Sequence, residues 1–103
     1  MKIFDFEILL FSFQVSDFGQ SWRDGRAFHS LLHSIDPEIV DPEKVMESTN
    51  QQNLAQAFKI AEEVFGVPQI LDPEDIDVER PDEKSVMMYV AEIIKVWFQI
   101  YFI

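Results

Sequence analysis

Three stretches of this chain place apolar residues at intervals of three and four, which restricts the fold to packed helices. The first stretch is expected to begin at about Trp22, where Ser21 and Asp24 have the spacing of a capping box. It should end at Asp36, because Pro37 disfavours helical geometry in the residue before it. Its apolar positions form one stripe: Trp22, Phe28, Leu31, Leu32 and Ile35.

The other two periodic stretches also have recognisable ends. The second opens at Ser48 or Thr49, each with a glutamine three residues later, and stops at Gly66 and Pro68. The third begins at Pro81, which suits the first helical position. The apolar positions are Leu54, Ala57, Phe58, Ala61 and Phe65 in the second stretch, and Val86, Tyr89, Val90, Ile93, Ile94 and Trp97 in the third.

Two Asp-Pro segments, residues 41–45 and 72–76, join these stretches as short turns in which the aspartate can cap the turn. We find no alternating strand pattern, repeat or low-complexity linker between residues 15 and 98. The predicted fold class is therefore all-α, with three main helices and short turns in one compact domain, since 103 residues are too few for two independent cores.

Composition excludes several functions. The chain has no cysteine, so disulfides and thiolate chemistry are impossible, and it suits a reducing, cytoplasmic compartment. Its net charge of −11 repels phosphate backbones and anionic lipid surfaces, so we expect no nucleic acid partner. Residues 86–103 are apolar, but Glu92 and Lys95 make a membrane span there unfavourable. Residues 1–13 carry acids inside the apolar run and no cleavage pattern, so a signal peptide is not favoured.

Two groups of polar residues are candidate metal sites. His29 and His33 stand four apart, which can place two imidazoles on one side of a helix, but no third ligand is evident. The acidic stretch 72–83 has an aspartate, Asp77, where a calcium hand needs glycine, so its acids are better explained by two helix N-termini. No phosphate loop or nucleophile motif occurs, so we expect no metal, no cofactor and no catalysis.

Read in order, the segments "DFGQSWRDGRAFHSLLH", "NLAQAFKIAEEVFGVPQILDPEDI" and "RPDEKSVMMYVAEIIKVW" resemble a calponin-homology domain. More narrowly, they resemble the second domain of the tandem actin-binding region in the spectrin, alpha-actinin, dystrophin, nesprin and calmin group. On this basis the domain spans residues 15–98. Residues 1–14 form an atypical apolar segment, in which the family's first helix is missing or replaced. Residues 99–103 form an atypical apolar tail.

The resemblance implies a non-enzymatic module of the actin cytoskeleton, which binds filamentous actin weakly alone and supports a preceding calponin-homology domain. In similar tandems the start of the last helix faces that first domain, which implies an interface role for Lys84 and Met88; the other reading of Lys84 is a solvated lysine. The alternatives are a stand-alone adaptor that does not bind actin, or an inactive truncated product. With His33 in a packed role implied by the resemblance, the expected core is Trp22, Phe28, Leu31, Leu32, His33, Leu54, Phe58, Tyr89, Ile93 and Trp97.

Overall fold

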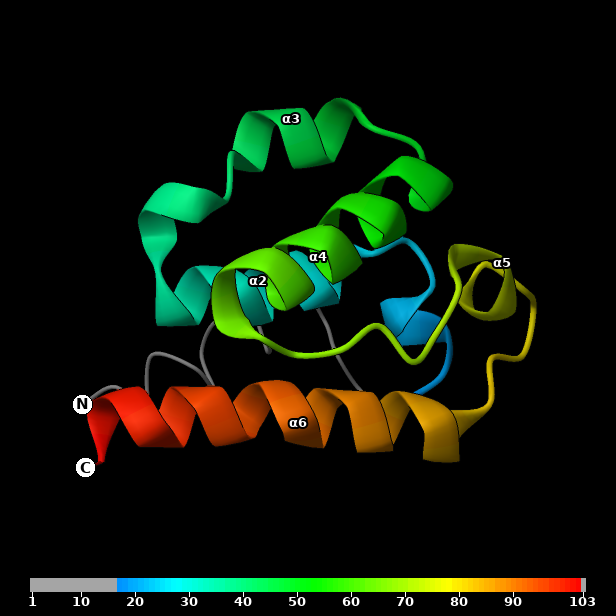
Figure 1. Cartoon of the computed structure of the whole chain (residues 1–103). Coiled ribbons are helices and arrows are strands. Elements are labelled where there is room, and N and C mark those ends of the chain that lie inside the picture. Colours follow the sequence, from blue (N-terminus) through cyan, green and yellow to red (C-terminus); the bar gives the residue numbers. More distant parts are fainter. Residues whose placement is uncertain (1–16, 103) are drawn as a thin grey trace.

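A computed structural model of the chain describes residues 17–102, which form helices joined by turns and irregular segments and contain no strand. The predicted all-α class and the three main helices, α2, α4 and α6, are confirmed. Helix α2 packs against both α4 and α6, so it is the central helix (Figure 1). The elements are the 3₁₀ turn η1 (Gln20–Trp22), α2 (Arg26–Ile35), the 3₁₀ turn η2 (Pro37–Ile39), α3 (Pro42–Glu47), α4 (Asn50–Phe65), α5 (Pro73–Ile76) and α6 (Glu83–Tyr101).

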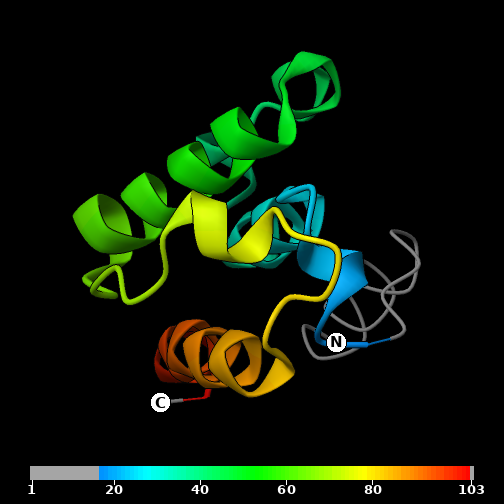
Figure 2. The ribbon, with the colours of Figure 1, turned by 90° about the vertical axis from the view of Figure 1, so that its right-hand side faces the viewer.

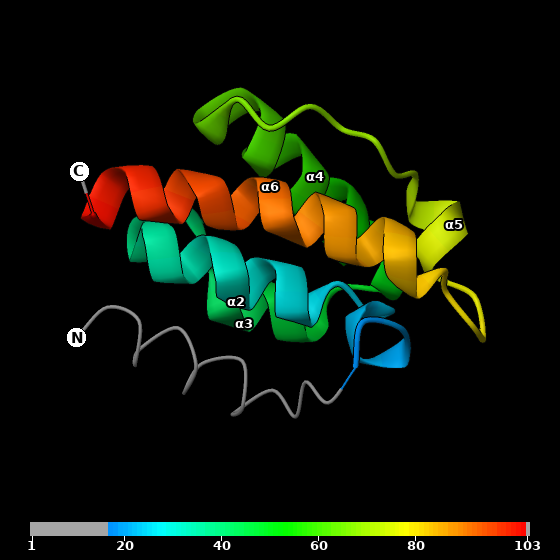
Figure 3. The ribbon, with the colours of Figure 1, turned by 90° about the horizontal axis from the view of Figure 1, so that it is seen from below.

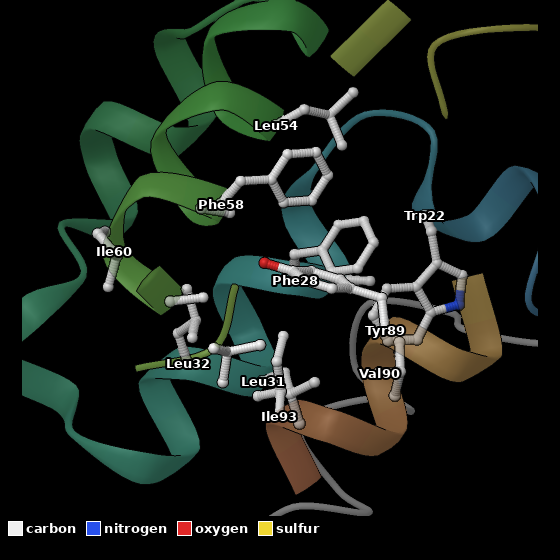
Figure 4. Close-up of a cluster of buried hydrophobic side chains, with 14 of the residues drawn as sticks. Trp22, Phe28, Leu31, Leu32, Leu54, Phe58, Ile60, Tyr89, Val90 and Ile93 are labelled. Carbon is white, nitrogen blue, oxygen red and sulfur yellow. The ribbon is translucent and has the colours of Figure 1, made fainter. Parts of the chain in front are cut away.

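The core lies where α2, α4 and α6 meet, and aromatic rings fill its centre (Figure 4). The Phe28 ring lies 4.8 Å from Trp22, 5.3 Å from Phe58 and 5.7 Å from Tyr89, measured between ring centroids. These distances and the tilted or edge-on angles are those that aromatic pairs prefer. Every residue expected in the core is buried except His33.

The start of α2 differs from the prediction. The α-helix begins at Arg26, four residues after Trp22, which instead ends the preceding 3₁₀ turn. Ser21 and Asp24 do not form a capping box: the Ser21 hydroxyl donates to Asp17 (3.1 Å), and the Asp24 carboxylate accepts the Arg26 amide (2.9 Å). The polar side chains bind their near neighbours in a turn, which competes with helix formation.

Gly25 explains why the helix starts where it does. Its φ of +81° lies in the left-handed region, which a side chain disfavours. Its α-carbon also lies so close to α4 that an added Cβ would stand 2.7 Å from the Asn53 Cβ and 2.8 Å from the Leu54 amide nitrogen. The glycine therefore permits both the turn and the close contact between the two helices.

Helix α4 has the ends that its sequence predicts. Thr49 is the N-cap, and the reciprocal hydrogen bonds between Thr49 and Gln52 complete a capping box. Gly66 ends the helix in the left-handed conformation at φ +71°, and the amide of Val67 donates to the carbonyl of Ala61 (2.9 Å). These local signals are sufficient to set both ends of the helix.

The two Asp-Pro segments contain the short helices α3 and α5. The Asp41 carboxylate caps α3 by accepting the amides of Glu43 and Lys44, as predicted for these aspartates. Asp72 makes no such side-chain bond, and there the prediction is wrong. The amide of Asp75 instead donates to the Asp72 carbonyl (2.9 Å), so the backbone closes that turn without the carboxylate.

Helix α6 begins at Glu83 with Asp82 as N-cap, so Pro81 precedes the helix and is not its first residue. At the other end, the helix continues to Tyr101, whose hydroxyl donates to the carbonyl of Ile35 (2.8 Å). Residues 99–101, expected as part of a tail, thus extend the helix and are tied to α2. The predicted atypical segment 1–14 lies outside the described residues.

Candidate interaction surface

Among the described residues, helix α6 lies along one edge of the domain, with one side facing the other helices (Figure 2). Seen from the α6 side, it runs beside α2 over most of its length (Figure 3). The inward side of α6 carries its buried residues, and these account for the periodicity in the sequence: Val86, Tyr89, Val90, Ile93 and Trp97.

The exposed side of α6 carries large apolar side chains among polar ones such as Glu92 and Lys95. Met88 and Phe102 are each 60% exposed, Met87 is 51% exposed and Phe98 is 43% exposed, although all four are large apolar side chains. Large apolar side chains that gather on a protein surface often mark a site that a partner covers. We call this surface, formed by Lys84, Met87, Met88, Phe98 and Phe102, the α6 outer face.

Lys84 begins this face and is exposed. Among residues 17–102, no carboxylate lies within 4 Å of its ammonium group, whereas Lys95 binds Glu92 at 2.9 Å. Lys84 and Met88 were both expected at an interface, and the structure places them one helical turn apart on the same exposed side. The sequence reasoning missed Met87, Phe98 and Phe102. The sequence does carry a signal for Met87 and Phe98, because these apolar residues fall on α6 outside the stripe of buried positions.

The two histidines have different environments. His29 is buried at 4% exposure, and its Nε2 lies 2.9 Å from the carbonyl oxygen of Asn53, so Nε2 carries the hydrogen and donates. His33 is only half-buried, because it lies beside an open cleft next to Met46 of α3. The prediction of His33 as a packed core residue is therefore wrong, and His29 is the packed histidine. Within the part of the chain that the structure describes, no three potential metal ligands gather.

The acidic stretch 72–83 connects parts of the fold that are distant in sequence. The Asp77 carboxylate accepts hydrogen bonds from Arg23 Nε, Asn50 Nδ2 and Gln51 Nε2, each at 3.1 Å. The bond from Asn50, followed by those from Gln51 and Arg23, lowers the pKa of this carboxyl below its ordinary value. Asp77 lies at the end of α5. Its hydrogen bonds therefore connect that end to two other segments, the turn before α2 and the start of α4.

Comparison with known protein families identifies the family to which this helical domain belongs. The family model of the calponin homology (CH) domain matches residues 11–98. The chain belongs to the CH domain family. As predicted from the resemblance, its relatives include nesprin and calmin. Nesprin-2 of Mus musculus is 45% identical over 84 residues, which cover 82% of this chain and 1% of the relative.

Two further relatives of this CH domain have similar coverage. Calmin of Homo sapiens is 42% identical over 81 residues, covering 79% of the chain and 8% of calmin. Microtubule-actin cross-linking factor 1 of Mus musculus is 47% identical over 78 residues, covering 76% of the chain and 1% of that protein. The chain thus spans a small part of the length of the curated relatives it matches. None of the helices described here is both long and apolar enough to cross a bilayer.

We predict that this CH domain loses stability as the pH falls below about 6.5, because of His29. Burial lowers the pKa of His29, and the hydrogen bond to Asn53 only partly offsets that effect. As the pH falls, His29 is therefore protonated in the unfolded chain before it is protonated in the folded domain. The free energy of unfolding decreases until the pH reaches the lowered pKa of His29 in the folded domain.

Urea unfolding between about pH 5 and pH 7.5 measures this effect. In the His29→Gln variant the side-chain amide can still donate to the Asn53 carbonyl but does not titrate, so the decline should become shallower. The His33→Gln variant keeps His29 and should keep the decline. An equally steep decline in His29→Gln would refute the assignment.

Proposed function

We propose that this CH domain is a non-enzymatic binding module of the actin cytoskeleton and acts as the second CH domain of a tandem. Membership of the family and the similarity to a protein named as a microtubule-actin cross-linking factor support the cytoskeletal role. The observation that carries the tandem role is the α6 outer face, which exposes four large apolar side chains beside Lys84, a lysine with no carboxylate partner among residues 17–102. On this proposal the protein works in the cytoplasm, in association with the cytoskeleton.

In the proposed tandem, the preceding CH domain packs on the α6 outer face. Met87 and Met88 suit such a contact because methionine adapts to irregular surfaces. The Lys84 ammonium can lie over an aromatic ring of the partner domain, which contributes about 0.5 to 2 kcal/mol depending on how fully it is desolvated. This contact holds the two domains closed and limits filament binding by the first domain.

We expect the isolated chain to bind filamentous actin only weakly. Its net charge of −11 gives no long-range attraction to an acidic filament. Co-sedimentation at physiological salt should therefore give a dissociation constant weaker than about 10 µM, and joining a first CH domain upstream should strengthen binding. Tight binding by the chain alone would contradict the assignment as a second domain. An absence of binding by the tandem as well would favour the adaptor role.

Lys84→Glu should act on the domain pair and leave the fold intact. Lys84 is exposed in the first turn of α6, where an added acid suits the helix dipole, so the free energy of unfolding should change by no more than about 0.5 kcal/mol. In the tandem, the variant should open the pair and strengthen filament binding.

The matched control is Lys44→Glu, which makes the same charge change on exposed α3, on the other side of the domain. The measurements are co-sedimentation of both tandem variants and urea unfolding of both single-domain variants. If Lys84→Glu and Lys44→Glu alter filament affinity equally, the effect is one of net charge, and the interface role of Lys84 is refuted.

A further inference from the structure

Two adjacent methionines, Met87 and Met88, are the most readily oxidised side chains of the α6 outer face. They are 51% and 60% exposed, so both side chains are open to solvent in the isolated domain. The chain has no cysteine, which leaves methionine as the main target of mild oxidants. A thioether is apolar and adaptable, whereas its oxidised form, the sulfoxide, is polar. The same two residues can therefore present either an apolar or a polar surface.

Their position on α6 places both methionines beside Lys84. They follow Lys84 by three and four residues, and residues at these intervals are neighbours on the surface of a helix. Among residues 17–102, the Lys84 ammonium group has no carboxylate within 4 Å. A thioether sulfur is only a weak hydrogen-bond acceptor, whereas a sulfoxide oxygen accepts readily. Oxidation of either methionine therefore gives Lys84 an acceptor within one turn of its own helix.

We propose that Met87 and Met88 form a regulatory oxidation site, at which a peroxide converts the thioether to the sulfoxide and opens the domain pair. This inference rests on the proposed function, in which the preceding CH domain packs on the α6 outer face. With hydrogen peroxide, the sulfur donates a lone pair to one peroxide oxygen and the O–O bond breaks. A proton passes to the second oxygen, which leaves as water. The sulfur loses two electrons, and the peroxide gains them.

Oxidation removes a favourable contact from the closed pair in either of two ways. A sulfoxide oxygen packed against the first domain needs a donor, because burying a polar group without one is unfavourable. The Lys84 ammonium group can supply that donor only by leaving the aromatic ring of the partner domain. Both routes favour the open pair, in which the first domain binds filaments. Because the closed contact covers the methionines, the open pair is the form that reacts, and oxidation then retains it.

The first measurement is the rate at which hydrogen peroxide oxidises each methionine, followed by peptide mass spectrometry as the gain of one oxygen. Met46 is the matched control, because it is 57% exposed on α3, on the other side of the domain from α6 (Figure 1). Joining a first CH domain upstream should slow the oxidation of Met87 and Met88 about fivefold and leave that of Met46 unchanged. The Lys84→Glu tandem should recover the faster rate.

The second measurement is co-sedimentation of the tandem with actin filaments, which are added after the peroxide has been removed. The oxidised tandem should bind about fivefold more tightly than the unoxidised tandem. The double variant Met87→Leu/Met88→Leu keeps the apolar volume but cannot form a sulfoxide, so peroxide should leave its affinity unchanged. Urea unfolding of the single domain should have the same midpoint before and after oxidation, because both side chains lie outside the core.

The outcomes distinguish this inference from the proposed function. If the first CH domain does not protect Met87 and Met88, its packing on the α6 outer face is wrong, and the regulatory site is refuted with it. If the two methionines are protected but oxidation leaves filament affinity unchanged, the tandem proposal stands and the regulatory site alone is refuted. An equal response to peroxide in the leucine double variant would place the effect at other residues and also refute the site.

Discussion

Replacing Gly25 with alanine should destabilise the domain far more than replacing Gly66 with alanine. Both glycines have a left-handed backbone, with φ of +81° and +71°. Alanine therefore costs about 1 to 2 kcal/mol of conformational energy at either position. At Gly66 no described residue other than its two chain neighbours lies within 4 Å of the added Cβ, so we expect the backbone cost alone.

At Gly25 the added methyl group meets atoms that cannot move aside. It would lie 2.7 Å from the Asn53 Cβ and 2.9 Å from the Asn53 carbonyl carbon, both held within α4. Moving Asn53 also strains the bonds that its amide group makes to the carbonyls of Asp24 (3.2 Å) and Val45 (3.0 Å). The overpacking adds about 1 to 3 kcal/mol or more.

Thermal and urea unfolding of the two glycine variants measure the difference directly, because the backbone cost is common to both. We expect Gly25→Ala to melt well below Gly66→Ala or to fail to fold. If the two variants lose the same free energy of unfolding, then α2 and α4 do not approach as closely as described.

Replacing Phe28 with alanine should cost about 3 to 5 kcal/mol of the free energy of unfolding. Phe28 is fully buried, and its ring contacts Trp22, Phe58 and Tyr89. Phe28 contributes the ring that links the turn before α2 to both other long helices. Its removal therefore leaves a cavity that rigid neighbours cannot close.

Phe98→Ala is the matched control, since Phe98 lies in α6 but is 43% exposed. Its loss should cost no more than about 1 kcal/mol. Phe28→Leu keeps most of the side-chain volume and should remain folded at an intermediate stability. Its free energy of unfolding can therefore be compared with that of Phe98→Ala even if Phe28→Ala does not fold. Urea denaturation of the three variants gives the ranking. A Phe98→Ala loss as large as that of Phe28→Ala would contradict the core described here.

Much of the fold could be predicted from the sequence because many of its causes are local. Thr49 and Gln52 cap α4 within one turn, and Gly66 ends it through its own backbone freedom. The spacing of apolar residues likewise identifies the buried side of each long helix, because a helix repeats every 3.6 residues. On the candidate surface, Lys84 and Met88 follow from the family resemblance and lie on the exposed side of α6.

The features that the sequence reasoning missed depend on contacts between distant segments. Helix α2 begins at Arg26 because Gly25 packs closely against Asn53, 28 residues away in the chain. His29 is buried where its ring donates a hydrogen bond to the carbonyl of the same Asn53. Asp77 has a lowered pKa because it binds side chains that precede it by 54, 27 and 26 positions. Periodicity finds which side of a helix is apolar, but only packing decides how much of that side is covered. Caps and turns are therefore properties of the sequence itself, whereas close approaches between helices and buried polar contacts exist only once the helices have packed.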